Sequence, residues 1–106
     1  MSMSQLQQQN VPAAAAYTEY SVKVPPQSKQ VTFNLRSGNQ PVYWYMTTTN
    51  GSTPGSSSNL PQSPNTYNTI PAGASRTIFG VLGGQSVYFQ TPGTNQVLEV
   101  DYYADV

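Results

Sequence analysis

The chain has 106 residues, of which 8% are charged, and its formal net charge is zero. Its few Lys and Arg residues are never adjacent, which argues against a nucleic-acid partner, because binding the phosphate backbone needs clustered cations. The sequence holds no Cys and no His, so it excludes disulfides, thiol chemistry and the Ser-His-Asp or Cys-His arrangements of nucleophilic catalysis.

Residues 1–16 are predicted to form an extended N-terminal arm. Gln and Asn dominate the segment, Val11-Pro12 interrupts it, and an alanine run ends it. An isolated stretch this short is marginal as a helix in water, and Pro12 limits any helix upstream of it. We expect the arm to lie along a neighbouring subunit, with Leu6, Val11 and the alanines filling small apolar grooves.

From Tyr17 onward, apolar and polar residues alternate with the period of two that half-buried strands show. Clusters of Gly, Pro and Asn separate the predicted strands and are typical of turns. The side chains expected to point into a core include Tyr20, Val22, Val24, Val31, Phe33, Leu35, Leu98, Val100 and Tyr102.

The run from Val42 to Met46 is bulky on both faces of its predicted strand. Val42, Trp44 and Met46 are expected to point inward. Tyr43 and Tyr45 are then on the opposite face, where tyrosine rings can anchor a protein interface or stack on sugar rings.

Residues 47–69 are rich in Ser, Thr, Asn and Pro and are predicted to form a long polar loop. A loop of this length is uncommon within a compact domain and is usually functional or disordered. Together with the short strands on either side, the pattern predicts that residues 17–106 form a single domain. We expect a small antiparallel β-sandwich or a jelly-roll-like barrel of about 6–8 strands.

Glu99 and Asp101 are separated by one residue and share the outward face of the last predicted strand. Paired carboxylates can perform acid/base catalysis in glycosidases or contribute to a Ca²⁺ site. Exposed acids on a strand also keep its surface soluble, and this role is the commoner one. We therefore expect no enzyme activity, no cofactor and no metal ion.

Tyrosine is the most abundant aromatic residue, with eight copies. Tyr43, Tyr45, Tyr88 and Tyr103 fall on predicted strand faces opposite the core. Tyr17 joins the predicted arm to the first strand. We expect partner-binding contacts from Tyr17, Tyr43, Tyr45 and Tyr103, together with Leu6 and Val11 of the arm.

Three segments carry a resemblance to small phage virion proteins: the turn Ile70-Pro71-Ala72-Gly73, the strand Ser86–Gln90, and the closing strand from Gln96 onward. The resemblance spans about residues 68–103 and is similar in texture to capsid cement (decoration) proteins and to short tail or fibre modules. It implies a β-sandwich whose terminal arm clamps neighbouring capsomers, without catalytic residues.

Two functions remain open at the level of the sequence. The first is a non-enzymatic virion structural protein, a capsid cement or minor capsid component. Its partners would be the major capsid protein or other virion subunits, and it would work as a homo-oligomer or a multi-copy assembly. The second is a carbohydrate- or receptor-binding module of a phage tail or fibre, with Tyr43, Trp44 or Tyr45 as a stacking platform for glycan.

The N-terminus lacks the basic and apolar regions of a secretion signal, and no stretch is apolar over a length that spans a bilayer. The sequence therefore predicts synthesis in the host cytoplasm and no membrane partner, and the resemblance to virion proteins implies location in the virion.

Overall fold

The computed structural model describes residues 3–46, 56, 60–61, 67–79 and 83–105 of the chain. All regular secondary structure within these residues is β, which confirms the predicted fold class. The strands are β1 (Met3–Ala13), β2 (Tyr20–Lys23), β3 (Gln30–Ser37), β4 (Val42–Tyr45), β5 (Asn68–Ile70), β6 (Ser75–Phe79), β7 (Ser86–Gln90) and β8 (Gln96–Asp105). The part of the chain that the structure describes contains no helix with the length and hydrophobicity needed to cross a membrane.

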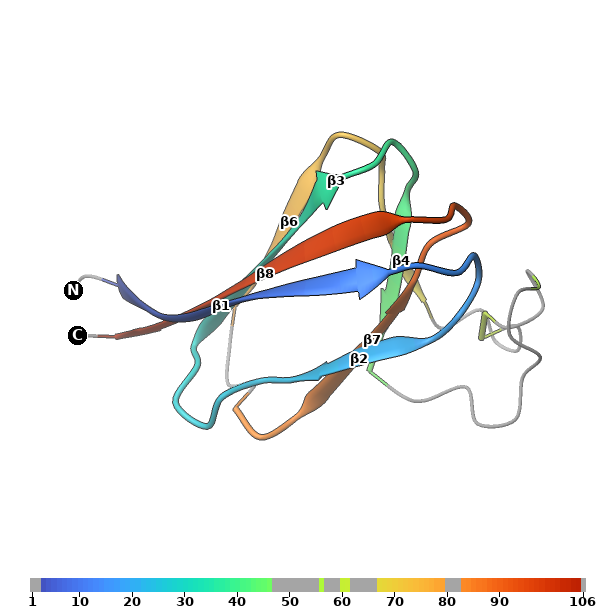
Figure 1. The fold of residues 1–106 in the computed structure, drawn as a ribbon. Coiled ribbons are helices and arrows are strands. Elements are labelled where there is room, and N and C mark those ends of the chain that lie inside the picture. The colour runs from blue at the N-terminus through green and yellow to red at the C-terminus, as the bar shows by residue number, and fades with distance from the viewer. Residues whose placement is uncertain (1–2, 47–55, 57–59, 62–66, 80–82, 106) are drawn as a thin grey trace.

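The strands form two four-stranded antiparallel sheets that pack face to face (Figure 1). The first sheet has the order β1-β8-β3-β6 and the second has the order β2-β7-β4-β5. The chain thus behaves as one long hairpin, in which β1 pairs with β8, β2 with β7, β3 with β6 and β4 with β5. Winding this ribbon into two sheets gives the strand order of a jelly roll, one of the two predicted architectures.

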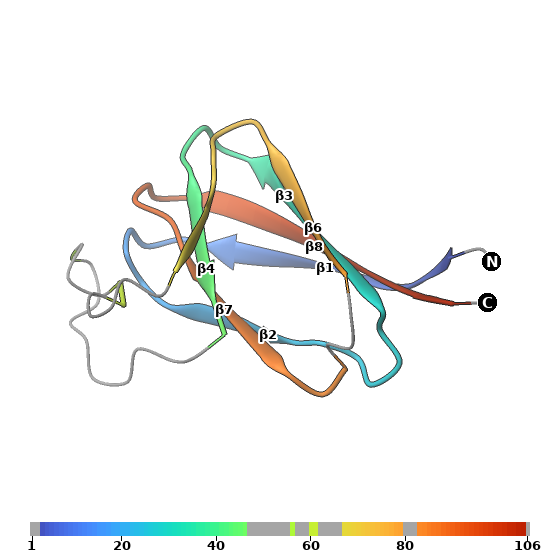
Figure 2. The ribbon, with the colours of Figure 1, turned by 180° about the vertical axis from the view of Figure 1, so that it is seen from behind.

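The two sheets face each other (Figure 2). The hydrophobic core lies between them and takes alternate residues from their strands. Phe33 of the first sheet contacts Trp44 of the second, with 5.7 Å between the ring centroids. The predicted inward positions of Val42 and Trp44 are confirmed, with 1% and 8% of their surfaces exposed. Met46 is 38% exposed, so its predicted inward position is wrong. The alternation stops applying at Met46 because β4 ends at Tyr45.

The structure corrects the prediction of a separate arm over residues 1–16. Strand β1 pairs with β8 of the same chain from Met3 opposite Asp105 to Ala13 opposite Gln96. A bulge between Gln5 and Gln7 is the irregularity in this register. The segment is extended, as predicted, but it is the first strand of the domain. Its backbone donors and acceptors need partners, and β8 supplies them within the molecule for the groups on its side of β1.

The predicted loop over residues 47–69 lies mostly outside the described residues. Its end differs from the prediction, because Asn68 and Thr69 belong to β5 and pair with Trp44 and Tyr43. A polar three-residue strand has too few side chains to show an alternating pattern. The position of β5 could therefore not be predicted from the sequence.

The β1–β8 pairing gives a test of this correction. Removing residues 2–13 after the initiator Met takes away β1 and the core side chains of Val11 and Ala13, and it exposes the edge of β8. A domain of this size is stable by about 5–15 kcal/mol, and we expect this loss to abolish cooperative folding. Circular dichroism and urea unfolding measure the effect.

Removing Ser2 alone is the matched control and is expected to leave the unfolding midpoint unchanged. A chain without residues 2–13 that unfolds cooperatively at the midpoint of the full chain would contradict the structure.

Candidate functional site

Tyrosine side chains gather on the outer face of the second sheet. Tyr43 and Tyr45 alternate with the core residues of β4, and Tyr88 alternates with the core residues of β7. Tyr45 stacks on Tyr88 with 6.1 Å between ring centroids and 15° between ring planes. Tyr67, next to β5, meets Tyr43 edge to face at 5.4 Å. We call Tyr43, Tyr45, Tyr67 and Tyr88 the tyrosine face.

Tyr45 is the buried member of this face, and a polar network holds it in place. Its hydroxyl donates a hydrogen bond to Glu19 Oε1 at 2.9 Å and accepts one from Gln90 Nε2 at 2.7 Å. Tyr45 is 1% exposed and Gln90 is fully buried. Glu19 belongs to the connection between β1 and β2, so the network ties this connection to the sheet. Tyr45 was predicted to contact a partner, and the structure corrects this, because Tyr45 is buried within its own chain.

Tyr43 and Tyr17 remain at the surface and lie near each other. Both side chains are half-buried. Burial raises the pKa of the Tyr43 hydroxyl, and the neighbouring hydroxyls of Tyr17 and Tyr67 raise this pKa further. Tyr17 has a left-handed backbone with φ of 48°, which is uncommon outside glycine, and its N–H donates to the Thr91 carbonyl at 2.8 Å. The turn therefore fixes Tyr17 beside the tyrosine face.

The other predicted partner-binding residues lie elsewhere. Val11 is 9% exposed and belongs to the core, so its predicted partner contact is corrected. Leu6 lies at the bulge of β1. Tyr103 is half-buried in β8, in register with Gln5 and Gln30 of the first sheet. The predicted residues therefore do not form one site. Tyr67 was missed, because it lies in the polar segment before β5, where no periodicity indicates a face.

The two carboxylates Glu99 and Asp101 lie on the outer face of the first sheet. Gln5 Nε2 donates a hydrogen bond to Asp101 Oδ1 at 3.1 Å. Burial raises the pKa of Asp101, and the charge of Glu99 and a side-chain hydrogen bond with Glu99 raise it further. No group of three or more His, Cys, Asp or Glu residues that could hold a metal ion occurs among the residues described. The pair can share a proton and lies among hydroxyl and amide side chains.

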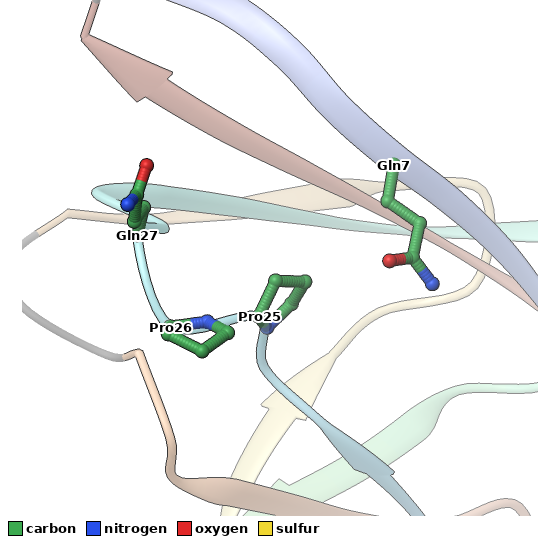
Figure 3. Close-up of a pocket in the computed structure, with 4 residues that line it drawn as sticks. All are labelled: Gln7, Pro25, Pro26 and Gln27. Atoms are coloured by element: carbon green, nitrogen blue, oxygen red, sulfur yellow. The ribbon is translucent and has the colours of Figure 1, made fainter.

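A shallow pocket of about 320 Å³ opens beside β1 (Figure 3). Gln7 of β1 lines one side, and Pro25, Pro26 and Gln27 of the β2–β3 connection line the other. These lining side chains are neutral. They offer amide hydrogen bonds and two apolar rings, and they lack the charged group that acid/base chemistry needs.

Comparison with protein-family models and with curated proteins finds no match. Among solved structures, the chain is similar to one from work described as "Bacillus endospore appendages form a novel family of disulfide-linked pili". The two chains are 13% identical, with a TM-score of 0.42, over 97% of this chain and 89% of the other. Chains this distant can share an arrangement of strands and differ in function. The present chain has no Cys, so it cannot form disulfide links of its own.

The polar network around the Tyr45 hydroxyl predicts the effect of Tyr45→Phe. The substitution removes the hydroxyl that joins Glu19 to Gln90 and leaves polar atoms of both without this partner. Losing one partner of a buried hydrogen-bonded group costs about 1–3 kcal/mol. Urea unfolding should therefore show Tyr45→Phe destabilised by that amount.

Tyr88→Phe is the matched control, because the Tyr88 ring stacks on Tyr45 and its side chain is half-buried. We expect it to change the free energy of unfolding by less than about 0.5 kcal/mol. Equal costs for the two variants would show that the network does not stabilise the fold.

Proposed function

We propose that the chain is a non-enzymatic structural protein that works in many assembled copies. The observation that carries this proposal is the polar, hydrogen-bonding character of the outer face of the first sheet. Apart from Glu99 and Asp101, most of the side chains in register on this face are amides and hydroxyls. They are Gln5, Gln8, Asn10, Gln30, Thr32, Asn34, Ser75, Thr77 and Tyr103.

This face, which we call the amide face, suits contacts between proteins. An amide is both donor and acceptor, and a hydroxyl is too, so such a face can match many polar surfaces, including its own copy. Zero net charge removes the repulsion that keeps copies of most soluble proteins apart. Both properties favour dense packing of many copies.

The finer assignment that we propose is a cement or minor capsid protein of a phage, located in the virion and bound to the major capsid protein or other virion subunits. Two features support it. Residues 68–103 resemble small virion proteins, and eight-stranded jelly rolls occur among viral capsid domains. Since β1 is part of the domain, attachment by a free arm is replaced here by attachment through faces and edges of the sheets.

Assembly is tested by sedimentation velocity of the purified full chain over a wide range of concentration, with electron microscopy of the same samples. We expect the mean mass to rise with concentration. Because most groups on this face are uncharged and their contacts are hardly screened, raising the salt from about 0.05 to 1 M should change the mass little. A chain that stays monomeric at every concentration, alone and mixed with purified phage capsids, would contradict the proposal.

A second candidate function is glycan binding by the tyrosine face. It is favoured by the edge-to-face pair of Tyr43 and Tyr67 beside Tyr17, since half-buried aromatic rings at a surface can stack on sugars. Trp44, once expected to share in such a platform, lies in the core. Jelly rolls are found in lectins as well as in capsids.

Glycan-array binding by the full chain tests this second function. If the tyrosine face binds sugar, Tyr43→Ala should reduce the binding at least about tenfold, because stacking on an aromatic ring is worth about 1–3 kcal/mol in the comparable case of nucleic-acid bases. Tyr103→Ala, on the other sheet, is the control and should bind as the wild type does. Binding that survives Tyr43→Ala would exclude this platform.

A further inference from the structure

The two sheets have four edge strands, and three of these are protected by a charge or by their shortness from pairing with another chain. Strand β2 carries the exposed Lys23, and β5 has only three residues. Strand β6 carries the exposed Arg76 opposite the core residue Phe33, which places a charge on the inward side of the edge. Charged side chains, inward-pointing charges, short strands, prolines and bulges are the usual means by which proteins protect sheet edges.

Strand β1 is protected only by a bulge and a proline, one near each end. It has 11 residues, it lies at the edge of the first sheet, and it contains no charged residue. Its irregularities are the bulge between Gln5 and Gln7 and the proline at position 12. These two features leave the stretch from Gln7 to Val11 as a regular, uncharged edge.

The direction of the backbone groups along this edge follows from two observations. The Tyr103 carbonyl accepts a hydrogen bond from Lys29 N–H at 2.7 Å, so it points toward β3. The backbone N–H and C=O groups of successive residues in a strand point alternately to one neighbouring strand and to the other. The backbone groups of Val100 therefore point toward β1, where the register partner of Val100 is Gln9. Gln8 and Asn10, on either side of Gln9, then direct their N–H and C=O groups away from β8.

Pro12 supports the same assignment. It follows Gln8 and Asn10 at the same two-residue spacing, so its backbone groups point to the same side of β1. Proline has no N–H to donate. Within a sheet, proline is placed where its nitrogen faces away from the neighbouring strand. The outward edge of β1 therefore offers paired donors and acceptors at Gln8 and Asn10, and only an acceptor at Pro12.

We propose that β1 pairs antiparallel with β1 of a second copy about a two-fold axis at Gln9, which joins two first sheets edge to edge. Gln8 of each copy then faces Asn10 of the other, and their backbone N–H and C=O groups exchange hydrogen bonds. This inference rests on the proposed multi-copy function and names one of its contacts.

The side chains favour a second copy of this chain as the occupant. Gln8 Nε2 donates to Asn10 Oδ1 at 2.6 Å within one copy, so the two amides already form a donor–acceptor row along the edge. Two-fold pairing sets this row against its own copy, where each amide meets another amide that can donate and accept. The bulge and Pro12 limit the contact to a short stretch. In a two-fold contact each copy pairs its edge with the other, so no third copy can add to that edge.

A single cysteine tests the register, since the chain has none of its own. In the proposed pairing Gln9 faces Gln9 of the second copy, with the Cα atoms about 4.5 Å apart. That separation lies within the range of about 4.4–6.8 Å that a disulfide spans. Under mild oxidation, Gln9→Cys should form a covalent dimer at least about tenfold faster than Ser21→Cys, because pairing gives the two thiols a high effective concentration.

Ser21 is a demanding control, because it is exposed on β2 of the other sheet whereas Gln9 is half-buried. Exposure alone would make Ser21→Cys the faster variant. Equal rates, or a faster Ser21→Cys, would overturn the proposed register.

A pair of lysine substitutions tests the contact without a covalent cross-link. In the double variant Gln8→Lys with Asn10→Lys, like charges face each other across the two-fold axis, which destabilises the dimer. Within one copy the new ammonium groups lie in register with Asp101 and Glu99, so the fold should be retained. Sedimentation equilibrium should show loss of the dimer, with an unchanged circular dichroism spectrum.

The matched control is Thr32→Lys with Asn34→Lys. It adds the same charge to the same face, also in register with Asp101 and Glu99, but on the central strand β3. It should dimerise as the wild type does. If the β1 variant assembles as the wild type does, the edge contact is excluded and the proposed function stands. If the wild type itself is monomeric throughout, both fail.

Discussion

The pairing of β1 with β8 is the constraint on which the rest of the molecule depends. In a jelly roll wound from one long hairpin, the outermost pair joins the two ends of the chain, and every other ribbon pair lies inside it. The pairing places Val11 and Ala13 in the core and makes β8 a central strand. It also decides which backbone is left at the edge of the first sheet. That backbone is an uncharged strand rich in Gln, not the acid-bearing β8.

The same constraint separates the surfaces of the two sheets. The chain leaves β1 and crosses to the second sheet through residues 14–19, where the Tyr17 turn and Glu19 contact the end of β7 and the buried Tyr45. This crossing buries part of the tyrosine face within the molecule. On the outer face of the first sheet, the exposed amides and hydroxyls include Gln5, Gln8, Asn10, Asn34 and Ser75. Under the two proposed functions, contacts between copies would use the first sheet, and glycan stacking would use Tyr43 of the second sheet and Tyr67 next to it.

The sequence predicted those parts of the fold in which burial follows a local period of two. Val31, Phe33, Leu98, Val100 and Tyr102 alternate regularly, and all of them are buried. It failed where a contact depends on residues far apart in the chain. The amide-rich β1 shows no alternation, and it becomes a strand only because β8 is there to pair with it. The alternation along β4 places Tyr45 outward, but Tyr45 is buried, because the connection between β1 and β2 contacts it through Glu19.

An uncharged edge is a hazard for a protein that must stay monomeric, since unpaired backbone groups recruit other strands without limit. In this chain the three other edges are each protected, by Lys23, by Arg76 or by the shortness of β5. On β1 the bulge and Pro12 shorten the edge, yet neither introduces a charge. A strand that is shortened but left neutral can still accept one partner of matching length, whereas a charged strand repels its own copy. This selective protection is the pattern expected of a protein in which one edge is used for assembly and the others are kept from it.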